Sequence, residues 1–381
     1  MKKRYFINGL LYLLVIITLA NCKTPYDPPL GNNQTNFLVV EGYIDGAAPT
    51  TIHISRTRML SAGDTAATKK ELFARVFVED DKQNRYPLVE AGEGVYTSNS
   101  ILNLNPANNY RLYVQTVDNI EYTSTYVPYK QTPVIDSVGW KFKDEGIQFY
   151  VNTHDASNKS RYYRWSYHET WEFRSIYNSR LEYNFLTDKV VTRNGQIYNC
   201  WGNAYSDRIL LASSAKLSDD VIYQAPLVDI ENHSKKMSIL YSILVTQYTL
   251  GAEEYNYWEA MRNNTEKIGS IFDPQPNQTI GNIQCITTPS EKVVGYIGAG
   301  SSYSKRYFVY NREMPDGWNL HPSCDQTLVT PDSTKFYFNY AGLIPTASIV
   351  LDSGAPAYLG APPRCVDCTL SGTNVKPDFW P

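Results

Sequence analysis

The histidines are the first residues to consider for chemistry, because a histidine titrates near neutral pH and binds metals. The 381 residues contain five of them, which are His53, His154, His168, His233 and His321. The pair His168-Glu169 begins like the zinc-protease motif HExxH, but no second histidine follows it. His154-Asp155 has the composition of a turn. The histidines therefore predict no metal site and no catalytic base.

The other residue types that commonly act in catalysis also form no recognisable catalytic motif. The segment 298–302 (GAGSS) lacks the flanking residues of a nucleophile turn, and a strand end is the simpler interpretation. The carboxylate pairs Glu253-Glu254 and Asp80-Asp81 are adjacent along the chain, so on a helix or strand they would not face each other. No phosphate loop or dinucleotide motif is present. We expect no catalytic residue and no cofactor.

Residues 1–21 are expected to be a targeting signal rather than part of the fold. Three basic residues precede an apolar run over 10–19, which is too short for a transmembrane helix. Residues 19–22 (LANC) resemble a bacterial lipoprotein signal, in which the cysteine becomes the acylated first residue. Cys22 is thus the predicted lipidation site, and the proline- and asparagine-rich segment 22–36 the predicted tether. A cleaved secretory signal and a retained anchor are the alternatives.

The charge of the chain argues against nucleic acid as a partner. The formal net charge is −3 at pH 7, and it becomes more negative once the basic signal is removed. The basic pairs Lys235-Lys236 and Lys305-Arg306 are isolated and are expected to be solvated at strand ends. Nucleic-acid binding needs a clustered basic surface, which this sequence does not predict.

The cysteines predict disulfides, since an exported chain meets an oxidising compartment. The chain has six, at positions Cys22, Cys200, Cys285, Cys324, Cys365 and Cys368. Once Cys22 is lipidated the remaining number is odd, so at least one thiol is free or pairs outside the chain. We favour two disulfides among the last four, with Cys200 left over, although spacing does not decide the connectivity. The CxxC at 365–368 follows two prolines and has no second metal-ligand pair, which favours a structural disulfide over redox or zinc chemistry.

The aromatic content suggests where a ligand or partner could bind. The chain has 31 tyrosines and 7 tryptophans. Such side chains pack well in sheets, and they are also enriched in binding surfaces because they combine large area with a polar tip. Two clusters are candidates for a binding surface: Tyr163, Trp165, Tyr167 and Trp171 in the first, and Tyr255 and Trp258 in the second. Simple packing is the alternative for each.

Two β regions follow from the alternation of apolar and polar residues. Short strands separated by turn signals are predicted at 37–44, 51–55, 72–79, 94–97, 110–117 and 122–127. They predict an N-terminal β-sandwich of the immunoglobulin kind over 37–130. A short linker leads to a second β-rich domain over 134–381, with strands at 147–153, 162–167, 238–249, 292–297, 306–311 and 335–339. The predicted fold class is therefore mainly β, with two immunoglobulin- or fibronectin-like sandwiches and a C-terminal tail that contains cysteines.

One amphipathic helix is predicted within the second domain, near 251–268. Its apolar and aromatic residues recur at spacings of three and four and lie on one face: Tyr255, Trp258, Met261, Thr265 and Ile268. An isolated helix of this length is marginal in water, so this face is expected to pack on a sheet. Proline residues in 273–276 end the helical pattern.

Several segments together resemble one known family. They are the lipoprotein signal at Cys22, LVVEGYI at 38–44, NTE at 264–266, GSIFDPQPNQTIGN at 269–282, Gly295-Tyr296, and the terminal CVDC with GTNVKPDFW. The chain resembles uncharacterised outer-membrane lipoproteins of Bacteroidota with a domain of unknown function numbered 4249. The resemblance covers nearly the whole chain. It implies attachment to the outer membrane, often beside a TonB-dependent transporter, and it implies no enzymatic activity.

Three hypotheses for function follow. The first is a non-enzymatic lipoprotein, held to the outer membrane by its lipid anchor, that binds a TonB-dependent transporter or its cargo. The second is an envelope hydrolase with an unrecognised site, which would require a carboxylate to converge with His168 or His321 in a pocket. The third is a purely structural envelope protein, which would have no pocket and no specific partner.

Overall fold

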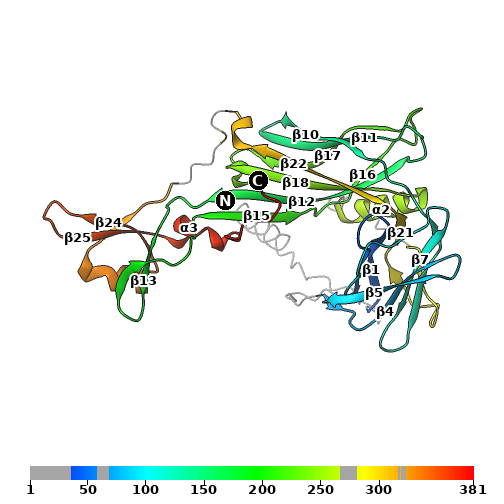
Figure 1. The fold of residues 1–381 in the computed structure, drawn as a ribbon, viewed down its shortest axis with the longest axis horizontal. Helices are drawn as coiled ribbons and strands as arrows, with labels where there is room; N and C mark the ends of the chain where they lie inside the picture. The colour runs from blue at the N-terminus through cyan, green and yellow to red at the C-terminus, as the bar shows by residue number, and fades with distance from the viewer. Residues whose placement is uncertain (1–35, 58–67, 267–280, 316–317, 319–322) are drawn as a thin grey trace, which may run out of the picture.

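The computed structural model describes residues 36–57, 68–266, 281–315, 318 and 323–381. The predicted signal, most of the tether and the proline-rich segment 272–276 lie outside the described residues. The described chain is mainly β and forms three parts (Figure 1). A pair of sheets forms the middle part, a small distal lobe lies beyond one end of it, and an N-terminal sheet lies beneath its other end.

The N-terminal part is a twelve-stranded sheet that nearly closes on itself like a barrel. Its order is β19-β8-β7-β4-β5-β6-β2-β1-β20, with β3, β9 and β21 paired beside this path. The strands are β1 (Leu38–Asp45), β2 (Thr51–Arg56), β3 (Lys69–Lys70), β4 (Arg75–Asp80), β5 (Arg85–Gly92), β6 (Val95–Thr97), β7 (Asn109–Gln115), β8 (Glu121–Ser124), β9 (Val127–Pro128), β19 (Ile283–Cys285), β20 (Val293–Val294) and β21 (Gly298–Gly300). Alternating residues of β7 are buried, as the sequence pattern predicts, and they fill the interior.

Three strands of this sheet come from far along the chain. β19 pairs with β8 at one end of the sheet, and β20 and β21 pair in parallel with β1 at the other. The segment 283–300 therefore brings the two ends of the sheet together. The sequence pattern assigned this segment to the second domain, because a local alternation does not reveal which distant strand a segment pairs with.

The middle part consists of two sheets that share one hydrophobic core. The first has the order β10-β11-β17 and the second the order β15-β12-β18-β22, with β16 also paired to β12. Their strands are β10 (Ile135–Lys143), β11 (Gly146–His154), β12 (Tyr162–Arg174), β15 (Asn199–Tyr205), β16 (Leu210–Ser213), β17 (Val221–Glu231), β18 (Leu240–Thr249) and β22 (Ser302–Tyr310). Phe149 of β11 and Tyr241 of β18 meet across the core, with ring centroids 4.9 Å apart.

The distal lobe contains a hairpin and a three-stranded sheet of order β23-β25-β24. Its strands are β13 (Leu181–Asn184), β14 (Lys189–Thr192), β23 (Thr327–Val329), β24 (Ile344–Val350) and β25 (Pro356–Ala361). The strand predicted at 335–339 is wrong, because Lys335–Tyr340 forms a π-helical turn. In that turn the Ala341 amide donates to the Phe336 carbonyl, and Phe338 is the buried residue. The alternating aromatic residues therefore pack through one turn of helix rather than through a strand.

The predicted helix is confirmed as α2 (Ala252–Glu266), but its buried face differs from the prediction. Glu254 and Tyr257 are its buried residues, whereas Tyr255, Trp258 and Met261 are half-buried and Thr265 is exposed. The reason is the place of α2 beside both the N-terminal sheet and β12, so that neighbours on two sides define its contacts (Figure 1). Ile268 lies outside the described residues.

Short helical segments complete the described chain. They are η1 (Lys235–Met237), η2 (Asn311–Glu313), η3 (Pro331–Ser333), α3 (Pro363–Val366) and η5 (Cys368–Leu370). Among the described residues, no helix has the length and apolar character that crossing a membrane requires.

Two disulfides hold the C-terminal tail, and their pairing corrects the prediction. Cys200 bonds to Cys368 and Cys324 bonds to Cys365, whereas Cys285 is a free, buried thiol. Cys285 lies on β19 inside the N-terminal sheet, so it cannot reach the tail cysteines. Cys200 lies on β15, along which the tail runs, with Trp201 and Thr373 exchanging backbone hydrogen bonds. The CxxC is structural, as predicted, and each of its cysteines pairs with a different partner.

This pairing predicts a selective pattern of alkylation. In a soluble form that begins after Cys22, Cys285 should resist iodoacetamide in the native state, because its thiol is buried and burial raises its pKa. After denaturation without a reducing agent, Cys285 alone should be labelled. Peptide mass spectrometry measures this directly, and labelling of Cys200 or Cys324 under the same conditions would contradict the pairing.

Candidate functional site

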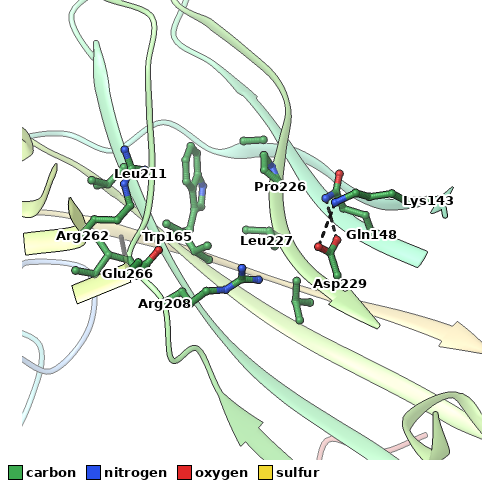
Figure 2. Close-up of a pocket in the computed structure, with 14 residues that line it drawn as sticks. Lys143, Gln148, Trp165, Arg208, Leu211, Pro226, Leu227, Asp229, Arg262 and Glu266 are labelled. Atoms are coloured by element: carbon green, nitrogen blue, oxygen red, sulfur yellow. Dashed lines mark hydrogen bonds and ion pairs between the residues drawn. The ribbon is translucent and has the colours of Figure 1, made fainter. Parts of the chain in front are cut away.

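A cleft of 310 Å³ lies in the middle part of the molecule (Figure 2). β12 and β16 form one side of it, β17 and β11 form the other, and the last turn of α2 closes one end. Its lining consists of Lys143, Gln148, Trp165, Arg208, Ile209, Leu210, Leu211, Ala225, Pro226, Leu227, Val228, Asp229, Arg262 and Glu266. The cleft therefore combines an apolar wall with a small set of charged side chains.

The strand pairing explains how Arg208 reaches the cleft. β15 pairs with the second half of β12, from His168 to Arg174, and β16 pairs with its first half, from Tyr162 to Trp165. The connection between β15 and β16 crosses from one half to the other and carries Arg208. Glu266 of α2 accepts a hydrogen bond from the Ile209 amide at 2.8 Å, which ties this connection to the helix.

Trp165 lies at the inner wall of the cleft and is 2% exposed. Its indole N–H donates to Gln247 Oε1 at 2.8 Å, so the polar atom of the ring is already satisfied. Trp165 therefore offers the cleft an apolar ring and no free donor. Of the first predicted aromatic cluster, this residue alone lines the cleft.

The other three residues of that cluster are core residues, which corrects their prediction as a binding surface. Tyr163, Tyr167 and Trp171 are 0%, 6% and 7% exposed. They share one face of β12, the central strand of its sheet, and this face packs against the other sheet of the middle part. Burial raises the pKa of Tyr167 to about 12, so its hydroxyl stays protonated at neutral pH. Alternation along a strand identifies a common face but not whether that face is covered.

The second predicted cluster lies at the junction between the N-terminal sheet and the middle part. The Tyr255 ring packs against Tyr162, with centroids 5.0 Å apart. The Arg164 guanidinium lies over the Trp258 ring at 4.5 Å and over the Tyr248 ring at 4.8 Å. Both predicted residues remain half-buried, and their role as a binding surface stays a prediction.

Glu254 is the buried charged residue of this junction, and the sequence pattern gave it no special role. It is 5% exposed and lies against the backbone of Gly298 in β21, where no Cβ would fit. Burial raises its pKa to about 7, and the positive charge of Arg164 opposes that rise. Lys130 opposes it as well, whereas Tyr43 and Tyr296 are the hydroxyl-bearing side chains nearby. The junction thus contains a carboxyl group that titrates near neutral pH.

The histidines do not gather with carboxylates in the cleft. His154 pairs with Asp136 at 2.8 Å on an exposed surface. His168 stacks on Tyr205 with centroids 4.3 Å apart, and burial lowers its pKa. Among the described residues, neither the His154 ring nor the His168 ring has a hydrogen bond to a hydroxyl group. His321 lies outside the described residues.

Metal coordination also finds no support in the described parts of the chain. No three histidine, cysteine, aspartate or glutamate side chains come together there in a way that could hold a metal ion. The described residues that line the cleft include no histidine, cysteine, serine or threonine. The cleft offers charged side chains and apolar surface.

Comparison with known proteins places the chain in a family. No curated protein matches it. Residues 23–306 match the model of a family described as a domain of unknown function, DUF4249. This match covers most of the N-terminal sheet and of the middle part, including α2 and the cleft, and it ends within β22. The chain therefore belongs to the DUF4249 family of unknown function.

Proposed function

We propose that the protein is a non-enzymatic lipoprotein of the outer membrane that assists a TonB-dependent transporter by binding the transporter or its cargo. The cleft is the observation that carries the binding role. It is concave and partly apolar, and it holds charged side chains without a serine, threonine, cysteine or histidine among its described lining residues. Sites of this composition bind small molecules.

The anchor at Cys22 is the second part of this proposal. The sequence before Cys22 supports it, because a short apolar run ends at a cysteine after a basic start. Several acyl chains on one residue would hold the protein firmly to a membrane, whereas one chain alone binds weakly. The matched family region begins at residue 23, directly after this cysteine. The Bacteroidota origin and the transporter belong to the same proposal and rest on the sequence resemblance.

We also infer that the middle part is a β-sandwich of the immunoglobulin or fibronectin kind. Its two sheets share one core and consist of antiparallel pairs, which supports this description. For the N-terminal part, the nearly closed strand order favours a barrel-like description over two separate sheets.

A pull-down from outer membranes solubilised in mild detergent tests the function. The tagged wild-type protein should recover a TonB-dependent transporter, identified by mass spectrometry. A Cys22→Ala variant should stay in the soluble envelope fraction and recover less transporter, because it cannot be acylated. Recovery of no transporter by the anchored protein, or equal membrane attachment of the Cys22→Ala variant, would contradict the proposal.

A further inference from the structure

The charged side chains that line the cleft differ in whether other groups of the protein already bind them. Asp229 accepts hydrogen bonds from Gln148 at 2.8 Å and from Lys143 at 3.3 Å, as Figure 2 shows. Glu266 accepts from the Ile209 amide. Both carboxylates of the lining are therefore already engaged by donors of the protein.

The two arginines differ from these carboxylates. Arg262 lies 3.6 Å from Glu259, one turn earlier on α2, which is a long and weak ion pair. Arg208 is exposed, and none of the ion pairs or hydrogen bonds found among the described residues involves its guanidinium. Figure 2 shows this guanidinium directed into the cleft, on the side of Leu227 and Asp229. The cleft thus presents a cation whose fork of donors is open to a ligand.

Charge limits the ligand to a single negative charge. Lys143, Arg208 and Arg262 oppose Asp229 and Glu266, so the lining has a small excess of positive charge. A group with several negative charges would meet both carboxylates at close range without enough cations to compensate them. A carboxylate suits the planar guanidinium, because the two can form a pair of parallel hydrogen bonds.

The apolar wall limits the rest of the ligand. Trp165 has no free donor, and Leu210, Leu227 and Val228 have apolar side chains on the same lining. A volume of 310 Å³ is at the small end of ligand sites, which are roughly 300 to 1,000 Å³. The ligand must therefore pair its charge with a compact apolar body.

We propose that the cleft binds a small monocarboxylate with an apolar body, and that Arg208 is the residue that pairs with the carboxylate. This proposal rests on the proposed function, because it names the chemistry of the cargo. An apolar amino-acid derivative and the C-terminus of a short apolar peptide share this chemistry.

Isothermal titration calorimetry with matched probes tests whether the cleft binds a monocarboxylate. N-acetyl-leucine should bind at least about tenfold more tightly than the neutral N-acetyl-leucinamide, since hydrogen bonds to a charged group are stronger than those to a neutral group. Leucyl-leucine blocked at its amino terminus serves as the peptide probe, and tighter binding of this probe than of N-acetyl-leucine would assign the site to peptide ends. The same or weaker binding would assign it to single amino-acid derivatives.

Substitutions test whether Arg208 is the residue that causes the preference for the acid. Arg208→Gln should lose the preference for the acid, and Arg208→Lys should keep part of it because the positive charge remains. Arg75→Gln is the matched control, since Arg75 is exposed on β4 and remote from the cleft lining. Equal binding of acid and amide, or an unchanged preference in Arg208→Gln, would overturn the proposal. The pull-down measures recovery of the transporter, whereas the calorimetry measures binding of the small probes. The two proposals can therefore fail separately.

Discussion

Removal of the Cys200–Cys368 disulfide is expected to lower the free energy of unfolding by about 5 kcal/mol, from the loop-entropy relation. The bond joins residues 168 positions apart, so its loss frees a long loop in the unfolded chain. A domain is stable by only about 5–15 kcal/mol, and this loss is therefore a large part of the total. Urea unfolding of Cys200→Ala/Cys368→Ala, compared with wild type, measures it.

The second disulfide supplies the matched control. Cys324–Cys365 closes a loop with a separation of 41 residues, for which the same relation gives about 4 kcal/mol. The Cys200–Cys368 variant should also loosen the end of the tail, where Trp380 is buried against Leu240 and Trp201. Its tryptophan emission should shift to longer wavelength before global unfolding. Unfolding at the wild-type urea concentration would show that the bond does not stabilise the fold.

Replacement of Glu254 by glutamine is expected to stabilise the protein above neutral pH. The pKa of Glu254 is raised from 4.5 to about 7 in the folded protein. Between these two values the folded state binds more protons than the unfolded state, so wild-type stability falls as the pH rises through this window. A glutamine stays neutral and avoids that fall. The gain should reach about 3 kcal/mol at pH 8, from about 1.4 kcal/mol for each pKa unit.

The direction of the pKa shift of Glu254 depends on whether burial or the nearby positive charges have the stronger effect. Burial at the junction disfavours its charged form, while Arg164 and Lys130 favour it, and the raised pKa shows that burial prevails. Thermal unfolding of Glu254→Gln and wild type from pH 4.5 to pH 8 gives the difference. Glu253→Gln is the matched control, because it makes the same chemical change at an exposed position on the same turn. A difference between Glu254→Gln and wild type that is independent of pH would refute the assignment.

The pattern of residues predicted part of the local structure, and it missed strands such as β10, β17 and β24. Alternation in β7 and β11 matches their observed burial, because side chains of a strand point to opposite faces in turn. The helix at 252–266 follows from spacing and from the prolines beyond it. A strand was wrongly predicted at 335–339, where alternating aromatic residues form a π-helical turn, since the pattern of a short segment does not separate the two structures.

Long-range pairing was beyond the sequence pattern. The two disulfides were expected, but Cys200 rather than Cys285 takes part, because strand order places β15 beside the tail and β19 in the N-terminal sheet. The cleft was missed for the same reason. Arg208 comes from the connection between β15 and β16, and the apolar wall of the cleft comes from β12, β16 and β17. A signal existed in Trp165, which the aromatic pattern singled out, but Arg208 had none.

The sequence by itself determined the β class, the place of the helix at 252–266 and the structural nature of the CxxC. It also predicts the anchor at Cys22. These properties depend on neighbours within a few residues, where composition and period act directly. Only the tertiary structure decided which thiols meet, that Glu254 is buried beside Gly298, and that Arg208 enters a cleft beside Trp165. These properties depend on contacts between residues far apart in the chain, and sheet order rather than local pattern sets such contacts.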